Sequence, residues 1–281
     1  MAPDQFIITV INLLIFFFII LVAKYVYGWL HPHFNLQNQL PEKDNPALAF
    51  AVTGYYLGLT FIIGGAIHTA GSGLLTNTIQ LVFYGLIGII LLNLSSMVND
   101  KLILRKFANL KMVVVDRNTG TGVVVGANYL ANGIIMFGAL SGPGSTLATA
   151  IVFWLIGQIT LIIAVTIYDL ITPFELQAEI EKDNIAVSIS VAGVLIGIGL
   201  LIASAINVEF ISWSDHFSRI GYYFAGGVIM LPVLRFISDK TILAGRRLTD
   251  ELVNLEVPNT GAGLLEAFLY VGTALIIGWT I

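Results

Sequence analysis

The tetrapeptide Glu-Lys-Asp-Asn occurs twice, at residues 42–45 and 181–184, and each copy stands directly before a long apolar segment. The two apolar segments share a Gly-x-x-x-Gly motif, at 54–58 and at 193–197. Asn is a favoured N-cap residue, so each tetrapeptide indicates the start of a helix. We therefore interpret the chain as one unit that is written twice.

The repetition continues along the whole chain, with about 139 to 141 residues between equivalent positions. Such self-similarity is the signature of an internal repeat. We place the first repeat at residues 1–143 and the second at 144–281. The matching positions are Tyr27 and Pro32 with Tyr168 and Pro173, Tyr84 and Gly88 with Tyr223 and Gly227, 100–104 with 239–243, and 118–122 with 259–263.

The composition indicates a lipid environment. Of the 281 residues, 57% are hydrophobic and only 11% are charged, and the mean hydropathy is +0.90. Soluble domains carry about 25% charged residues. The net charge of −4 and the lack of a basic stripe argue against nucleic-acid binding. The absence of cysteine excludes disulfides, thiol catalysis and cysteine-ligated metals.

Eight apolar segments are long enough to cross a hydrocarbon core, which takes about 20 residues of helix. Backbone polar groups in lipid must be satisfied within each segment, so we predict an all-α, polytopic membrane protein. The first segment lacks the basic start and the cleavage site of a signal peptide, which favours a retained span. The expected spans are about 6–30, 46–68, 77–98, 119–140, 146–168, 185–206, 217–238 and 259–281.

The distribution of basic residues predicts the topology. Every lysine and arginine except Arg219 falls in or beside alternate loops. Positive residues are enriched in cytosolic loops, so we expect both termini outside the cytosol, in a bacterial plasma (inner) membrane. Four spans in each repeat give the two repeats the same orientation. We therefore predict a covalent pseudo-dimer with a pseudo-two-fold axis along the membrane normal.

The two longer cytosolic loops, 99–118 and 239–258, have the pattern of amphipathic helices, which commonly lie at a membrane surface. In the first loop, Ile103, Phe107, Leu110 and Val114 share a face, opposite Lys101, Arg105, Lys106 and Asn109. In the second, Leu248, Leu252 and Leu255 oppose Arg246, Arg247, Asp250 and Glu251. The loops are expected to be either surface connectors or, over 100–114 and 240–255, docking faces for a soluble cytosolic partner.

The order of these features resembles a bacterial inner-membrane family named domain of unknown function 350. The shared features are an apolar span that ends in Tyr-x-x-x-x-Pro, an acidic-Asn start of a glycine-rich span, a further span, an amphipathic linker and a last span that begins Asn-Thr-x-x-Gly. Members are typically single four-span units, so the resemblance implies two fused units over essentially the whole chain. It implies no settled activity. Some members are associated by gene context with membrane-remodelling proteins of the phage-shock kind and with ATP-grasp ligases.

Four asparagines stand at equivalent helix starts on the expected cytosolic side, namely Asn45, Asn118, Asn184 and Asn259. One interpretation is that each residue caps its own helix. The other is that the four positive helix ends together bind an anion, such as a lipid phosphate or a small acidic solute. The sequence leaves both interpretations open.

Glu266 is the one acidic residue inside an expected span, and its counterpart in the first repeat is Val125. Ionisable residues at membrane depth mark functional sites, so Glu266 is a candidate proton or cation site. The alternative is that it snorkels or forms a local hydrogen bond. Lys24 and Arg235 stand at span ends and are expected to snorkel. Hydrogen bonds between helices are expected from Asn12, Gln80, Asn93 and Gln158.

Three classes of function follow. Two are equally favoured: a transporter, channel or lipid- or anion-handling protein, and a membrane scaffold or envelope-stress component that docks a soluble partner. A membrane-embedded enzyme is the least favoured, because no catalytic triad, nucleophile elbow or His–carboxylate metal site is visible. We expect no cofactor and no metal. The expected partners are membrane lipids and further copies of the chain.

Overall fold

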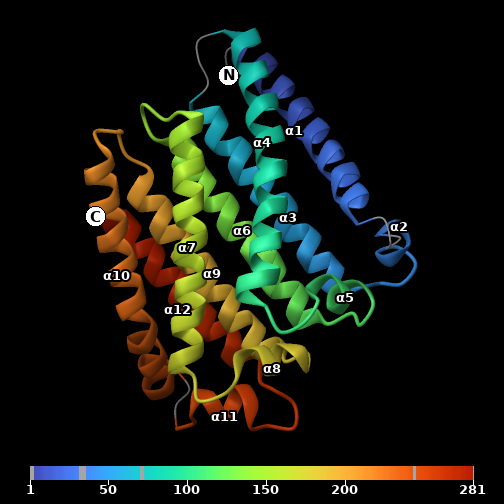
Figure 1. Ribbon diagram of the computed structural model, residues 1–281, viewed down its shortest axis with the longest axis vertical. Helices are drawn as coiled ribbons and strands as arrows, with labels where there is room; N and C mark the ends of the chain where they lie inside the picture. Colours follow the sequence, from blue (N-terminus) through green and yellow to red (C-terminus); the bar gives the residue numbers. More distant parts are fainter. Residues whose placement is uncertain (1–2, 32–35, 70–72, 243–244, 281) are drawn as a thin grey trace.

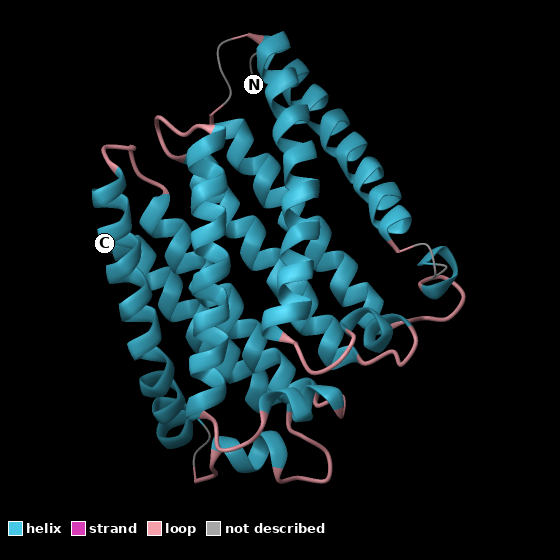
Figure 2. Ribbon diagram, viewed as in Figure 1, coloured by secondary structure: helices cyan, strands magenta, loops and turns pink. Residues whose placement is uncertain are grey.

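The computed structural model describes residues 3–31, 36–69, 73–242 and 245–280, and every regular element in this part of the chain is a helix (Figure 1, Figure 2). Eight of these helices are long and apolar enough to cross a membrane, which confirms the predicted fold class. Pro32, which the repeat matches to Pro173, lies outside the described residues. The eight helices are α1 (Pro3–Leu30), α3 (Pro46–His68), α4 (Leu74–Val98) and α6 (Thr119–Ser141) in the first repeat, and α7 (Leu147–Ile171), α9 (Ile185–Ile206), α10 (Trp213–Ile237) and α12 (Thr260–Thr280) in the second.

The short helices gather at one end of the bundle, which we call the linker face (Figure 1). They are α2 (Leu36–Gln39), α5 (Asn109–Val114), α8 (Leu176–Glu181) and α11 (Leu248–Val253). Two π-helical turns, η1 (Asn99–Ile103) and η2 (Ser238–Ile242), extend α4 and α10 toward this face. The N-terminus lies at the opposite end of the bundle (Figure 1).

The linkers differ from the single amphipathic helix that each was expected to form, because both fold back on themselves. Asp100 in η1 accepts a hydrogen bond from the Asn109 amide at 2.7 Å, and Asp239 in η2 accepts one from the Leu248 backbone N–H. Each acid thereby fixes the start of the next short helix. Asn109 is consequently buried, although it was expected on the polar face, and Leu255 is exposed, although it was expected on the apolar face.

Four helices form the central row of the fold, in the order α3, α6, α9 and α12, and the other four spans flank it. A methyl group added to Gly54 would overlap the backbone of Gly126, and one added to Gly193 would overlap Ala267. Membrane helices approach this closely when small residues line their interface. The two Gly-x-x-x-Gly motifs therefore serve the close packing of helices within the row.

The two repeats pack head to tail, so the predicted pseudo-two-fold axis is wrong. A two-fold axis would exchange α3 with α9 and α6 with α12. A contact between α6 and α9 would then require an equivalent contact between α12 and α3. α6 packs extensively on α9, but α12 makes no comparable contact with α3, which stands at the other end of the row (Figure 1). As a result, 89% of the most apolar stretch of α6 is buried, against 28% of that of α12.

Candidate functional site

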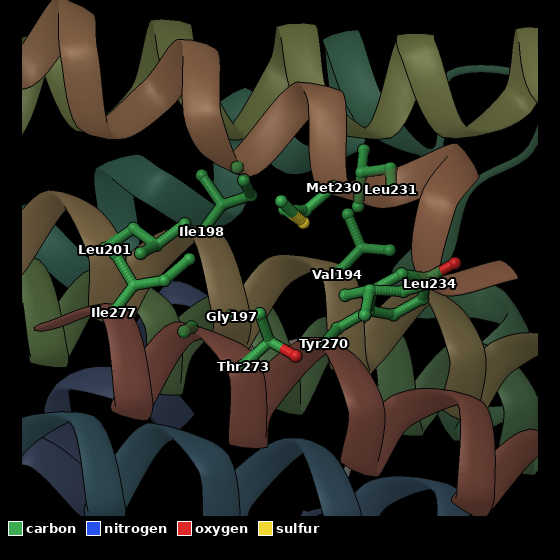
Figure 3. Close-up of a pocket in the computed structure, with 12 residues that line it drawn as sticks. Val194, Gly197, Ile198, Leu201, Met230, Leu231, Leu234, Tyr270, Thr273 and Ile277 are labelled. Carbon is green, nitrogen blue, oxygen red and sulfur yellow. The ribbon is translucent and has the colours of Figure 1, made fainter. Parts of the chain in front are cut away.

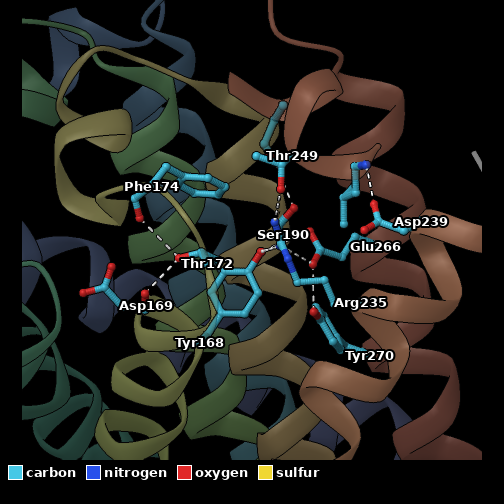
Figure 4. Close-up of polar contacts among 12 residues, drawn as sticks. Tyr168, Asp169, Thr172, Phe174, Ser190, Arg235, Asp239, Thr249, Glu266 and Tyr270 are labelled. Atoms are coloured by element: carbon cyan, nitrogen blue, oxygen red, sulfur yellow. Dashed lines mark hydrogen bonds and ion pairs between the residues drawn. The ribbon is translucent and has the colours of Figure 1, made fainter. Parts of the chain in front are cut away.

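A buried ion pair joins α10 to α12 near the linker face of the second repeat (Figure 4). Arg235 donates to Glu266 Oε1 at 3.0 Å, and the two side chains are 10% and 0% exposed. Arg235 therefore does not snorkel as expected, because its guanidinium points inward to Glu266. Charges at this depth persist only when they are paired and hydrogen-bonded.

Neutral hydrogen-bonding groups complete the surroundings of this pair. The Tyr168 hydroxyl donates to Glu266 Oε2 at 3.0 Å, and the Tyr270 hydroxyl donates to Oε1 at 2.8 Å. Arg235 also donates to the Thr249 hydroxyl at 3.1 Å, which ties α11 to the site. Both oxygens of the Glu266 carboxylate thus have partners from other elements or from the next turn of α12 (Figure 4).

The ion pair is neutral as a unit, and the hydrogen bonds occupy its charged atoms. Glu266 therefore offers no uncompensated negative charge to a proton or a cation, and the structure places it in the local hydrogen bonds that were the alternative. Tyr168 and Tyr270 were not predicted from the sequence as members of the site. A usable signal was present, since Arg235 and Glu266 both lack a charged counterpart in the first repeat.

The first repeat carries a small cavity where the second repeat carries its ion pair. Ser96 stands at the position of Arg235 and Val125 at the position of Glu266, and both line a cavity of about 20 Å³. This volume holds about one water molecule or an ion of similar size. Tyr27, the counterpart of Tyr168, is retained in the cavity wall.

Oxygen ligands line this cavity without a fixed cation. Asp100 supplies a carboxylate that forms no ion pair with any described residue. Asn109 is 3% exposed, and its Oδ1 is buried without a hydrogen-bond partner. Leaving a buried acceptor unpaired costs about 1–3 kcal/mol, so a bound donor or cation would gain that amount. From the sequence, Asp100 was predicted only as a position that aligns the two repeats.

The second repeat has a cavity of its own, at a position that the first repeat fills. A cavity of about 20 Å³ between α9, α10 and α12 has an apolar wall that includes Val194, Ile198 and Leu234 (Figure 3). In the first repeat Tyr55 stands at the position of Val194, and its ring centroid lies 5.1 Å from that of Tyr129. The first repeat therefore fills this space with Tyr55 and leaves the space beside Asp100 open, whereas the second repeat fills the latter with its ion pair. The cavity of the second repeat has only Thr273 and Tyr270 as polar lining residues and no charged one, which leaves the cavity beside Asp100 as the candidate binding site.

The predicted asparagines cap their helices. The side-chain oxygens of Asn45, Asn118, Asn184 and Asn259 accept hydrogen bonds from the backbone N–H groups of Leu48, Thr121, Val187 and Ala262. In the same order, their amide groups donate to the carbonyls of Val113, Ile180 and Leu252 and to the carboxylate of Glu251. The capping interpretation is confirmed. The shared anion site stays a prediction. Because the asparagine amides already donate to other groups, only the helix ends themselves would contribute to such a site.

Three of the polar residues expected to join helices do so. Asn93 donates to the Tyr55 hydroxyl at 2.9 Å, which joins α4 to α3. Asn12 accepts from Asn77 at 3.4 Å, and Gln158 donates to Asn132 Oδ1. These bonds hold the flanking spans to the row and to one another.

The surroundings of Glu251 on α11, at the linker face, make the folding stability depend on pH. Hydrogen bonds from Asn259 at 2.7 Å and from Arg246 at 3.0 Å hold its pKa below the ordinary glutamate value. Its contribution is therefore present above the ordinary pKa and is lost as the pH falls through the lowered pKa. We expect Glu251→Gln to lower the thermal unfolding temperature at neutral pH, by a difference that shrinks as the pH falls below the ordinary pKa of glutamate.

The control for this experiment is Glu256→Gln, which changes an exposed acid on the same linker. Thermal unfolding of the three proteins in one detergent over that pH range decides the matter. A difference for Glu251→Gln that stays constant with pH would contradict the assignment.

Eight spans in two tandem units, each with a buried polar cluster under its linker, define a polytopic all-α membrane protein. The chain belongs to the family described as Domain of Unknown Function (DUF350), which matches residues 1–140 and 144–281. A similar protein, described as UPF0719 transmembrane protein from Aquifex aeolicus (strain VF5), is 23% identical over 272 residues, which cover 94% of this chain and 96% of the relative. No solved structure matches the chain. The two matched segments confirm the resemblance to a duplicated unit.

Proposed function

We propose that this chain is a transport protein that takes up a small monovalent cation in the polar cavity of the first repeat. One observation carries the proposal. In the second repeat the side chains of Arg235 and Glu266 fill this space with a fixed ion pair. In the first repeat Ser96 and Val125 replace that pair, and the cavity that remains is lined by the imidazole of His31 and by Asp100, whose carboxylate makes no ion pair with any described residue.

The cavity suits an ion about as large as a water molecule, such as ammonium or an alkali-metal ion. Its volume of about 20 Å³ is too small for a larger organic cation. Asp100 contributes one negative charge, and the Asn109 Oδ1 and the Ser96 hydroxyl are neutral oxygen ligands. A calcium ion takes six to eight oxygen ligands, often several carboxylates, so a singly charged ion fits this set better.

Binding is tested by thermal unfolding of the purified protein in ammonium, sodium or potassium chloride against N-methylglucamine chloride at equal ionic strength. We expect at least one small cation to stabilise the protein, by about 2.7 kcal/mol at 100 times its Kd. Asp100→Asn is expected to abolish the difference between salts. The double variant Ser96→Arg with Val125→Glu, which imports the ion pair of the second repeat, is expected to do the same.

The matched control for Asp100→Asn is Asp116→Asn, which neutralises an exposed acid in the same linker and should keep the difference between salts. Passage across the membrane is tested separately, by cation flux into proteoliposomes. Flux above that of protein-free vesicles, lost in Asp100→Asn, is the expected result. Equal unfolding temperatures in all salts would contradict the binding site, and tight vesicles would contradict transport.

The orientation belongs to the same proposal, with the linker face in the cytosol of a bacterial inner membrane. The basic residues support it, since all of them except Arg219 fall in or beside the loops of that face. On this orientation the cavity takes its cation from the cytosol. We propose no catalytic step.

A second candidate is a scaffold that docks an acidic soluble partner on the linker face. The exposed side of the first linker supports it, because Lys101, Arg105, Lys111 and Arg117 are all exposed there. The apolar sides of α5 and α11 pack inward through Val113 and Leu252, so a partner on 100–114 or 240–255 would meet the charged side. The scaffold requires tight vesicles and no specific cation effect, so the two experiments above separate the candidates.

A further inference from the structure

Two apolar helix faces stand at the two ends of the central row without a partner in the described chain. On α12, Phe268, Ile276 and Trp279 are exposed and border a shallow groove of about 430 Å³. On α3, Phe50 and Leu57 are exposed. Within the chain, α6 packs on α9. By the repeat, the free α12 face corresponds to the α6 side of this contact, and the free α3 face corresponds to the α9 side.

The internal contact between α6 and α9 shows how such faces fit together. A methyl group added to Gly199 on α9 would lie 3.1 Å from Ala131 on α6, so one small residue on each helix brings the backbones close. On the free faces, Thr60 of α3 stands at the position of Gly199, and Gly272 of α12 stands at the position of Ala131. In this pair the glycine lies on the other helix, and both residues are small. At the next close contact, that of Gly138 with Ala203, the free faces carry Trp279 on α12 and Gly64 on α3, so the large residue meets a glycine.

A polar clasp closes the internal contact at the linker face. The Gly120 N–H in the first turn of α6 donates to Asp183 Oδ1 at 2.8 Å, and the Asn118 amide donates to the Ile180 carbonyl at 2.9 Å. Asp183 belongs to the second Glu-Lys-Asp-Asn tetrapeptide and has a left-handed backbone with φ 63°. Such a backbone is uncommon outside glycine, so the residue is held in a defined orientation.

The two ends of the row carry the separate halves of a second clasp. Asp44, in the first tetrapeptide, has the same left-handed backbone with φ 45°, but it is exposed and makes no hydrogen bond or ion pair with any described residue. Gly261, the counterpart of Gly120, is exposed in the first turn of α12, and its N–H has no acceptor within the described chain. First-turn N–H groups need an acceptor from outside their helix.

We propose that a second copy of the chain packs its α3 face on this α12 face, with Asp44 of one copy accepting a hydrogen bond from the Gly261 N–H of the other. The occupant is a second copy because the donor, the acceptor and the small pair of Thr60 with Gly272 stand at positions that meet in the α6–α9 contact. Acyl chains would cover the apolar residues and water would hydrate the two exposed groups, but neither would join Asp44 to Gly261. The contact is heterologous, so assembly proceeds to a closed ring or an open row.

Cysteine crosslinking in native membranes tests this contact, because the chain has no cysteine of its own. We expect Asp44→Cys with Gly261→Cys to form covalent dimers and higher species under a short thiol crosslinker. Each single variant should stay monomeric, and co-expression of the two single variants should give dimers only. The control pair joins Gly261→Cys to Leu14→Cys, an exposed position on α1. Crosslinking no stronger than this control, or strong crosslinking of either single variant, overturns the proposal.

A second variant tests the helix faces without the clasp. Gly272→Leu should lower the crosslinked fraction of the double-cysteine protein about tenfold, because a bulky side chain holds the two backbones apart. A Cβ atom added there would meet only the ring of Phe268, at 3.5 Å and in the same copy, and the position borders the open groove, so the thermal unfolding temperature of the protomer should change little. Gly226→Leu on α10, where nothing lies within 4 Å, is the control. Crosslinking that is indifferent to Gly272→Leu overturns the proposed packing.

Discussion

Replacing Glu266 with valine is expected to destabilise the protein by about 3–5 kcal/mol, because the change leaves Arg235 buried without its counter-charge. Arg235→Ser alone is expected to cost a similar amount, since it strands the carboxylate. The double variant Arg235→Ser with Glu266→Val should be more stable than the sum of the two changes predicts, by about 2 kcal/mol. It carries the residues that the first repeat already has at Ser96 and Val125.

Equilibrium unfolding in mixed detergent micelles measures the three variants against the native protein. Glu256→Val, which removes an exposed acid of the linker face, is the control and should change the stability little. Additive effects of the two changes would contradict the view that these charges are stabilised by each other. If the two changes are strongly coupled but the double variant is still much less stable than the native protein, the remaining loss of stability belongs to the hydroxyls of Tyr168 and Tyr270, which lose their acceptor.

Gly54→Ala is expected to be nearly as damaging, at about 3 kcal/mol, although it adds a single methyl group. That group would overlap the backbone of Gly126, and backbone cannot move aside as a flexible side chain can. The central row would have to separate between α3 and α6. The yield of folded protein and its unfolding in mixed micelles give the measurement.

The control for this glycine is Gly226→Ala on α10, which adds the same methyl group where nothing lies within 4 Å. It should leave stability within about 0.5 kcal/mol of the native protein. Equal behaviour of the two alanine variants would contradict the role of close backbone contact in the row.

Local patterns were sufficient to predict the eight spans and the starts of the spans that an asparagine caps. The expected spans 46–68 and 185–206 coincide with α3 and α9, since Asn45 and Asn184 act on the first turn of the helix that follows each of them. The order of the helices in space was beyond such patterns. Four spans in each repeat fix only the orientation of the repeats, and a two-fold axis and a head-to-tail row satisfy that condition equally.

The candidate site was only partly predictable for the same reason. Glu266 was visible as an acid inside a span, but its partner Arg235 lies on another helix and at the end of an apolar segment, where the local pattern favours snorkelling. The fold of the linkers also depends on a distant contact, because Asp100 must reach Asn109 across a bend. Pairwise comparison of the two repeats, position by position, is what connects these residues.

Fusion of the two units in one chain has a consequence for how their chemistry can differ. Separate subunits translated from one gene must be identical, so a fixed guanidinium in one would be present in all. Within this chain the second unit keeps its own internal cation at Arg235, while the first unit retains an acid, Asp100, with a free space beside it. Covalent linkage therefore allows the two units to differ, so that the second unit holds a fixed internal charge while the first unit keeps an open space beside an acid.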